Sequence, residues 1–320
     1  MKKHTASILR VLISIGALFF LFWQIGLDET IEVLRQADLR CLFLAFLFYL
    51  LSLIIRAGRW FVLLQGLSRS TSSGVPSVPF GRLLRLYFVG QFFSSFLPSQ
   101  FGGDVVRALE LTQDTDSSAS IGAVLLDRMT GLLVLFVIGL AVLPFNAARM
   151  EPWLVWLLLA VAGGGLTMGA LVLEGRFLRR ITAWLPSSLS LVGEGPLANI
   201  YAAITGCGRR AVWSAFGISL IFNLINVLIN WLCGRAVGTG ISLDYFFIAT
   251  PILSVSGLIP SIGGWGIRET VSTLIFTPTG TDANVAAAIG VMVGIVTLAA
   301  GLIGGILYGI EGLRGLRTGR

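Results

Sequence analysis

Lysine is almost absent from this sequence, because Lys2 and Lys3 are the only lysines among its 23 Lys and Arg residues. A Walker A phosphate loop, a Schiff-base enzyme and an internal kinase active site each require a lysine within the folded domain. The sequence therefore excludes these classes, and we expect no hydrolysis of ATP by a known motif.

Cysteine and histidine are equally scarce, with three cysteines (Cys41, Cys207 and Cys233) and a single histidine, His4. No two cysteines have the Cys-x-x-Cys spacing, and none has a histidine at metal-ligand spacing. A disulfide framework, a zinc site and a redox motif are all disfavoured. We expect no metal ion and no other cofactor.

Charge is the third scarcity, since 12% of the 320 residues are charged while 55% are hydrophobic. The mean hydropathy of +0.88 is too high for a water-soluble domain, so the composition predicts an all-α, polytopic integral membrane protein. The net charge of +7 is spread between apolar runs and forms no continuous basic face, so nucleic acid is not an expected partner. Six runs are long enough to cross the bilayer: 8–26, 41–64, 119–143, 153–173, 211–233 and 285–310.

The first of these runs follows Lys2, Lys3 and Arg10, as the apolar part of a secretory signal would. No small-x-small cleavage site follows it. We therefore expect an uncleaved first transmembrane helix.

Two short stretches are degenerate copies of each other: residues 97–107 and residues 259–268. Each has Pro-Ser, then Gly-Gly, then an arginine four residues after the second glycine. Proline and glycine pairs that break apolar segments at matching places in two halves indicate a transporter built from inverted repeats. The expected break residues are Pro98, Gly102, Gly103, Pro260, Gly263, Gly264 and Gly266.

The distribution of arginine predicts how the chain crosses the membrane, because loops rich in Lys and Arg face the cytoplasm. The model that fits leaves only Arg35, Arg40, Arg149 and Arg235 outside, apart from arginines placed in the membrane. Segments 82–111 and 244–276 then each begin and end on one side, as re-entrant hairpins entering from opposite faces. The alternative counts them as full crossings.

This topology divides a single transmembrane domain, residues 1–320, into two repeats at about 40–145 and 211–310. An amphipathic cytoplasmic linker, 174–210, joins them, and both termini are expected in the cytoplasm. Irregular backbone at membrane depth must line a polar cavity, so both breaks should meet at one. The short helices that follow, 104–111 and 267–276, would present their N-terminal amides to an anion such as a lipid phosphate.

Charged residues within apolar segments cost about 2.5 to 3.5 kcal/mol each, so they are candidates for function. The spacing of Asp104, Arg107 and Glu110 places them on one helix face, whereas the adjacent Arg268 and Glu269 point apart. Alternative interpretations are that Arg56 and Arg59 extend to the lipid headgroups, and that Asp127 and Arg128 form an interfacial helix start or an internal salt bridge. The candidate headgroup-binding residues are Asp104, Arg107, Glu110, Asp127, Arg128, Arg268, Glu269, Arg56 and Arg59.

The motifs themselves resemble a known family. The segments concerned are Phe96 to Ser99, Gly102 to Arg107, Leu126 to Arg128 with Gly131, Pro260-Ser261 and Gly263 to Glu269. Together they look like the lysylphosphatidylglycerol synthase transmembrane family, and the likeness covers about residues 8 to 312. The resemblance implies a membrane part that moves aminoacylated phosphatidylglycerol between leaflets, while a separate soluble domain attaches the amino acid. Since the chain ends at Arg320, we expect that synthase domain to be absent, and lysyl transfer by this chain is not expected.

The residues and the resemblance together give the hypothesis of a lipid flippase or scramblase in the bacterial cytoplasmic (inner) membrane. Its substrate would be a phosphate-bearing lipid, either a phospholipid, with or without an amino acid, or a polyprenyl phosphate. One alternative is a membrane transferase with Asp104 or Asp127 as the base. The other is a non-catalytic subunit of a separately encoded lipid-modifying enzyme. The sequence leaves the oligomeric state open.

Overall fold

A computed structural model describes residues 35–70, 78–97, 101–147, 150–174, 176–184, 190–191, 195–259 and 261–318. Within these ranges the chain is helical and contains no β-strand, which confirms the predicted fold class. The predicted first span, 8–26, and the break residues Pro98 and Pro260 lie outside the described residues.

In the described part of the chain the bundle has five long helices: α3 (Leu39–Ser70), α6 (Ser117–Asn146), α7 (Pro152–Glu174), α10 (Arg209–Ala236) and α13 (Ala283–Thr318). The shortest has 23 residues, which at about 1.5 Å per residue covers more than the roughly 30 Å of bilayer hydrocarbon. All five are apolar enough to span a membrane. Each contains one of the apolar runs predicted between residues 41 and 310, so those five spans are confirmed.

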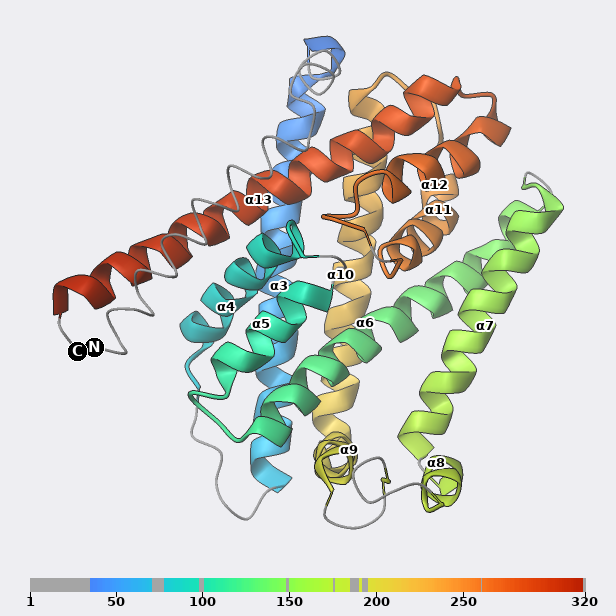
Figure 1. The fold of residues 1–320 in the computed structure, drawn as a ribbon. Helices are drawn as coiled ribbons and strands as arrows, with labels where there is room; N and C mark the ends of the chain where they lie inside the picture. The colour runs from blue at the N-terminus through green and yellow to red at the C-terminus, as the bar shows by residue number, and fades with distance from the viewer. Residues whose placement is uncertain are drawn as a thin grey trace.

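Four shorter helices form two broken hairpins: α4 (Phe80–Ser94) with α5 (Phe101–Leu111), and α11 (Leu243–Ser256) with α12 (Ile267–Phe276). The longest has 15 residues, or about 22 Å, which is too short to cross the hydrocarbon alone. In Figure 1 the outer ends of the α4–α5 hairpin lie toward the end of the bundle where α6 begins. Those of the α11–α12 hairpin lie toward the opposite end, so the two hairpins enter from opposite ends of the bundle.

The two breaks meet inside the bundle, as the sequence predicts. A Cβ atom added to Gly263, in the second break, would lie 2.7 Å from the backbone carbonyl oxygen of Ser95, in the first. Gly263 and Gly264 also have φ angles of +61° and +81°, which side-chain-bearing residues rarely adopt. Glycine is therefore required at Gly263 by the contact and by the backbone conformation together.

The two copies of the motif differ in structure, which the sequence comparison does not predict. Gly102 and Gly103 were expected in the first break, but they lie in the first turn of α5. A Cβ atom on Gly103 would lie 2.0 Å from the carbonyl oxygen of Gly90 on α4. The first Gly-Gly pair therefore serves close helix packing, whereas Gly263, Gly264 and Gly266 form the second turn.

Helix α13 contacts both hairpins through glycines, which let helix backbones approach closely. A Cβ atom on Gly290 would lie 3.0 Å from the backbone of Arg268 on α12. One on Gly304 would lie 1.9 Å from the carbonyl oxygen of Phe88 on α4. These approaches are so close that α12 and α4 pack against the backbone of α13.

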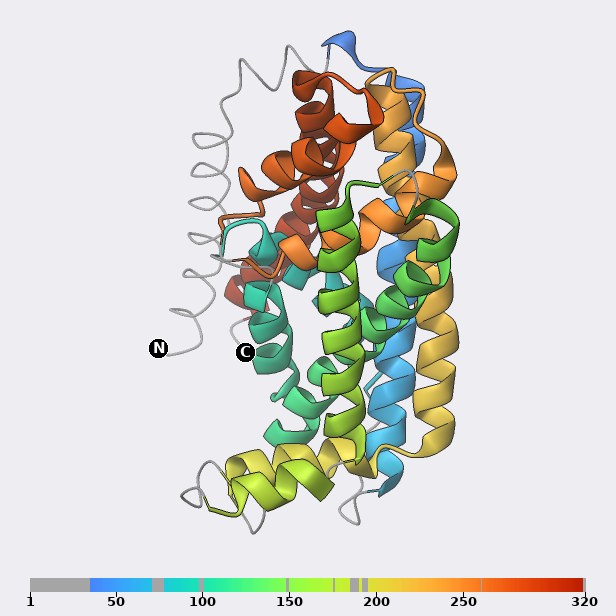
Figure 2. The ribbon, with the colours of Figure 1, turned by 90° about the vertical axis from the view of Figure 1, so that its right-hand side faces the viewer.

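Two further helices, α8 (Arg176–Thr182) and α9 (Pro196–Gly206), lie across one end of the bundle (Figure 2). They fall within the segment predicted as an amphipathic linker, although a separate helix at α9 was not expected. Tyr201 of α9 donates a hydrogen bond of 2.9 Å to the carbonyl oxygen of Val172 near the end of α7. The boundaries of the two sequence repeats stay a prediction.

The topology makes a prediction that cysteine labelling checks. Ser117 and Thr279 are exposed at the outer ends of the two hairpin units, and burial raises the pKa of the native Cys207 thiol to about 11. A protonated, buried thiol reacts slowly, so native labelling is low once Cys41 is replaced by serine. A membrane-impermeant maleimide should label the Ser117→Cys variant only in inside-out vesicles, and the Thr279→Cys variant only in intact cells. Labelling of both from one side would contradict the opposed hairpins.

Candidate functional site

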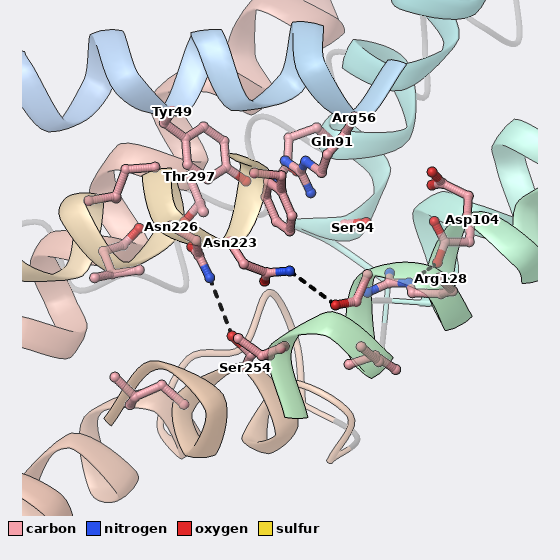
Figure 3. A pocket seen from close by; sticks show the side chains of 18 of the residues that line it. Tyr49, Arg56, Gln91, Ser94, Asp104, Arg128, Asn223, Asn226, Ser254 and Thr297 are labelled. Atoms are coloured by element: carbon pink, nitrogen blue, oxygen red, sulfur yellow. Dashed lines mark hydrogen bonds and ion pairs between the residues drawn. The ribbon is translucent and has the colours of Figure 1, made fainter. Parts of the chain in front are cut away.

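A polar cavity of about 190 Å³ lies where the two hairpins meet the long helices. Its walls come from both hairpins and from α3, α6, α10 and α13. Figure 3 shows Arg56 from α3 and Asn223 from α10 directed into this space, with Asp104 and Arg128 across it. A second pocket of about 90 Å³ shares Arg56, Arg128 and Arg268 with the cavity and reaches the break at Gly263.

Asp127 of α6 holds one side of the cavity together. Its Oδ1 atom accepts a hydrogen bond of 2.7 Å from Nε of Arg59, and its Oδ2 atom accepts one of 2.5 Å from the Tyr87 hydroxyl. Arg107 donates to the same Oδ2 atom at 3.5 Å. The side chains of Arg59, Arg107 and Asp127 are at most 4% exposed. Asp127 is therefore a buried carboxylate that two guanidinium groups share.

Asp104 of α5 joins Arg107 to one further arginine, Arg128. It accepts a hydrogen bond of 2.5 Å from Arg107 and one of 2.6 Å from Nε of Arg128. Asp104 also lies in the first turn of α5, where a negative charge offsets the positive end of the helix dipole. The carboxylates of Asp104 and Asp127 thus bind three arginines between them, and Arg107 links the two.

Two other arginines line the cavity without a carboxylate partner among the described residues. The Nε and Nη2 atoms of Arg56 are buried and make no hydrogen bond to any described residue. Arg268 donates one hydrogen bond of 3.2 Å to the carbonyl oxygen of Gly263, while its Nη1 atom is buried and has no acceptor within the described ranges. Buried donors without acceptors are costly, and two at one cavity mark a place for an anion.

Aromatic rings stabilise the Arg56 guanidinium in the absence of a carboxylate. Its central carbon lies 5.7 Å from the ring centre of Tyr49, 5.5 Å from that of Tyr87 and 5.1 Å from that of Phe222. Contacts between a cation and an aromatic face at these distances are favourable, and more so when water is excluded. The rings place the charge at the cavity wall and leave its donors available.

Glycine makes room for the buried guanidinium groups. A Cβ atom on Gly294 of α13 would lie 2.7 Å from Nη1 of Arg268, and one on Gly131 of α6 would lie 2.7 Å from Nη1 of Arg59. Gly294 packs beside the ring of Trp265 in the second break. Its absent side chain also makes the space in which Arg268 faces the cavity.

The charges that line the cavity do not balance. Five arginines and two aspartates give the lining a net charge of +3, and outside the lining the charge of Glu269 acts on Arg268. At membrane depth an uncompensated charge is expensive, because little water is present to screen it. The cavity is therefore suited to an anionic ligand.

Sequence reasoning placed nine charged residues at this site, and the structure brings seven of them to the cavity. Glu110 lies elsewhere, 3.7 Å from Arg82 in a charged cluster that joins α4, α5 and α13. Glu269 does not line the cavity, and both of its carboxylate oxygens are buried without a hydrogen-bond partner among the described residues. The interpretation that Arg59 extends to the lipid headgroups is wrong, because that residue is 3% exposed and bound to Asp127.

Uncharged polar residues of the site were missed. Asn223, Asn226 and Asn230 line the cavity from α10, and Asn226 donates a 3.4 Å hydrogen bond to the Ser254 hydroxyl on α11 (Figure 3). Their i, i+3, i+7 spacing within an apolar run was the available signal, because it places three amides on one helix face. Tyr49, Tyr87 and Phe222 carry no comparable signal, since aromatic residues are common in any transmembrane helix.

Comparison with known proteins places the chain in a family. The family model for the lysylphosphatidylglycerol synthase TM region matches residues 7–305. The chain is similar to a UPF0104 membrane protein of Pyrococcus horikoshii, with 22% identity over 96% of each chain. It is also similar to a UPF0104 membrane protein of Methanocaldococcus jannaschii, with 21% identity over 90% of this chain and 89% of the relative. With the matched region covering nearly all of its membrane helices, this integral membrane protein belongs to the lysylphosphatidylglycerol synthase TM region family.

Proposed function

We propose that the protein moves a phosphate-bearing lipid between the two leaflets of the membrane. The observation that carries this proposal is a pair of half-buried arginines, Arg56 and Arg268, that face one cavity with buried donor atoms and no salt bridge to a carboxylate among the described residues. Guanidinium groups bind phosphate oxygens through paired, charge-assisted hydrogen bonds. The headgroup would lie in the cavity while the acyl chains stay in the surrounding lipid.

The position of the cavity supports transport. It lies between two hairpins that enter from opposite ends of the bundle and meet at Gly263 and Ser95. In transporters built from inverted repeats, the substrate site lies near the bilayer midplane between such discontinuous helices. Rocking of one hairpin against the other would expose the cavity to one leaflet and then to the other.

The roles of the charged residues follow from their partners. Arg56 and Arg268 would bind the phosphate directly, and Arg128, which is 28% exposed, would add a third donor at the cavity edge. Arg59, Arg107, Asp104 and Asp127 would keep the cavity wall in shape, because each already has a partner of opposite charge. The proposed site leaves out Glu110 and Glu269, which do not line the cavity.

The proposed location is the cytoplasmic membrane, with both termini in the cytoplasm. The support is the arginine content of the connections at one end of the bundle, where α8 carries Arg179 and Arg180. A transferase or a subunit of another enzyme would use the same cavity differently, so the decisive experiment must separate movement from chemical change.

Reconstitution in liposomes tests the proposal. The purified protein would be inserted into vesicles that contain an anionic phospholipid labelled with a fluorophore on one acyl chain, and dithionite added outside. We expect the label of the inner leaflet to become reducible only when the protein is present, with the lipid recovered unchanged. An Arg180→Gln variant, altered on the exposed surface of α8, should behave like the wild type.

Two outcomes would overturn the proposal. An inner leaflet that stays protected in the presence of folded protein would contradict movement of the lipid. A chemically altered lipid, identified by mass spectrometry, would support the transferase instead.

A further inference from the structure

We infer that the cavity selects phosphomonoester headgroups that carry no ammonium group. The lipid nature of the ligand rests on the proposed function, whereas the headgroup chemistry follows from the cavity itself. Three observations support the inference. The carboxylates of Asp104 and Asp127 are both bound by arginines, and Arg56 lies within a cage of three aromatic rings. In addition, buried donor nitrogens of Arg56 and Arg268 lack acceptors among the described residues.

The first observation concerns the carboxylates, because a cationic headgroup needs one. Asp104 and Asp127 are the acidic residues of the cavity lining, and each is bound by two arginines at 2.5 to 3.5 Å. An ammonium group would find both counter-charges in use and five guanidinium groups nearby. Like charges at close range are strongly repelled where the effective dielectric constant is low. The aminoacylated lipids that the family resemblance suggests are therefore poor ligands for this cavity.

The second observation concerns quaternary ammonium groups, which proteins bind in cages of aromatic rings. Such a cage exists here in Tyr49, Tyr87 and Phe222, but Arg56 fills it. The protein therefore supplies its own cation at the place where a choline group would bind. Zwitterionic choline lipids are excluded for this reason as well as by charge.

The third observation is the number of donors without acceptors. Arg56 contributes two such nitrogen atoms and Arg268 contributes one, all buried. A phosphomonoester carries a charge of about −1.5 to −2 at pH 7 and three terminal oxygens, whereas a phosphodiester carries one charge and two terminal oxygens. The three donor nitrogens without an acceptor among the described residues match the three terminal oxygens of the monoester.

The size of the cavity agrees with a small headgroup. Its volume of about 190 Å³ is below the roughly 300–1,000 Å³ of sites that enclose drug-sized ligands. A phosphate group fits with a few water molecules. A phosphate extended by a lysyl-glycerol group would need the cavity to widen.

Equilibrium binding of short-chain lipids to the purified protein in detergent tests this selectivity. The probes would be dihexanoyl forms of phosphatidic acid, phosphatidylglycerol, phosphatidylcholine and lysyl-phosphatidylglycerol, with inorganic phosphate alone as a fifth. We expect phosphatidic acid to bind more tightly than phosphatidylglycerol, and at least about tenfold more tightly than either lipid with a cationic group, which corresponds to about 1.4 kcal/mol.

A pH series adds a second readout. The second ionisation of a phosphomonoester has a pKa of about 6, so its charge increases between pH 6 and pH 8, while arginine stays charged throughout. Binding of phosphatidic acid should strengthen over this range relative to phosphatidylglycerol. The Arg180→Gln variant should show the same preference, because Arg180 is exposed outside the cavity.

The outcomes separate this inference from the proposed function. Equal or tighter binding of lysyl-phosphatidylglycerol or phosphatidylcholine would overturn the selectivity, even if lipid movement is observed. Selective binding of phosphatidic acid without movement in liposomes would overturn the proposed function and leave the selectivity standing. If inorganic phosphate bound as tightly as phosphatidic acid, the ligand would be a soluble phosphate, and the lipid assignment would be wrong.

Discussion

Replacement of Asp127 by asparagine is expected to destabilise the folded protein by about 3 to 5 kcal/mol, the usual cost of removing one partner of a buried ion pair. Asp127 accepts hydrogen bonds from Arg59, Tyr87 and Arg107, and it is 1% exposed. The neutral amide would keep the shape of the side chain but remove the charge that balances two guanidinium groups. The variant should accumulate poorly and unfold at a lower temperature in detergent.

A matched control tests whether burial causes this loss. Asp114 also binds an arginine, Arg82, at 3.0 Å, but its side chain is 36% exposed at the end of the bundle. Exposed ion pairs contribute about 0 to 1 kcal/mol, so the Asp114→Asn variant should unfold within a few degrees of the wild type. Thermal unfolding followed by intrinsic fluorescence would measure both variants. An equal decrease of the unfolding temperature in the Asp127→Asn and Asp114→Asn variants would contradict the central structural role of Asp127.

Replacement of Arg268 or Arg56 by glutamine is expected to have the opposite pattern, with lost binding and retained stability. A hydrogen bond to a charged group is worth about 1.5 to 3 kcal/mol, so each variant should bind an anionic lipid about tenfold to a hundredfold more weakly. Neither arginine forms a salt bridge with a carboxylate among the described residues, so no salt bridge is broken, although the charge of Glu269 acts on Arg268. The folded protein should be as stable as the wild type.

Arg107→Gln provides the contrast within the same cavity. Arg107 is bound to both Asp104 and Asp127, so its loss would leave these carboxylates undercompensated and lower the unfolding temperature. Sequence reasoning alone suggests that Arg107 and Arg268 act alike, because the two occupy the same position in the duplicated motif. Titration of each variant with dihexanoyl phosphatidic acid, together with a measurement of its unfolding temperature, would show whether Arg107 and Arg268 have the same role. Unchanged affinity in both the Arg56→Gln and Arg268→Gln variants would remove the assigned site.

The sequence predicts the membrane architecture well because each span has a continuous apolar run. The runs 41–64 and 285–310 fall within α3 and α13, and the segments 82–111 and 244–276 are broken hairpins as expected. The polar cavity between them was also predicted, since the backbone of a break at membrane depth needs polar surroundings. These predictions use apolar runs, the duplicated glycine and proline motif and the distribution of arginine, all of which the sequence contains directly.

The pairing of charges was not predictable in the same way. Arg59 and Arg56 are three residues apart on α3, yet Arg59 is bound to Asp127 whereas Arg56 lies among aromatic rings. This difference depends on which helices lie beside α3, and the sequence does not specify those neighbours. The different roles of Gly103 and Gly263 were hidden for the same reason, because identical letters occur in a helical turn in one copy and in a left-handed turn in the other.

The glycines of α13 have a consequence for how the molecule tolerates mutation. Gly290 and Gly294 contact α12, while Gly301 and Gly304 contact α4, so a single helix supports the inner walls of both hairpins. Among these four, only Gly294 approaches a guanidinium group of the cavity. A substitution at any of the other three, which lie away from the cavity guanidinium groups, would nevertheless disturb one hairpin through its backbone. Harmful variants should accordingly accumulate along this helix as densely as around the arginines themselves.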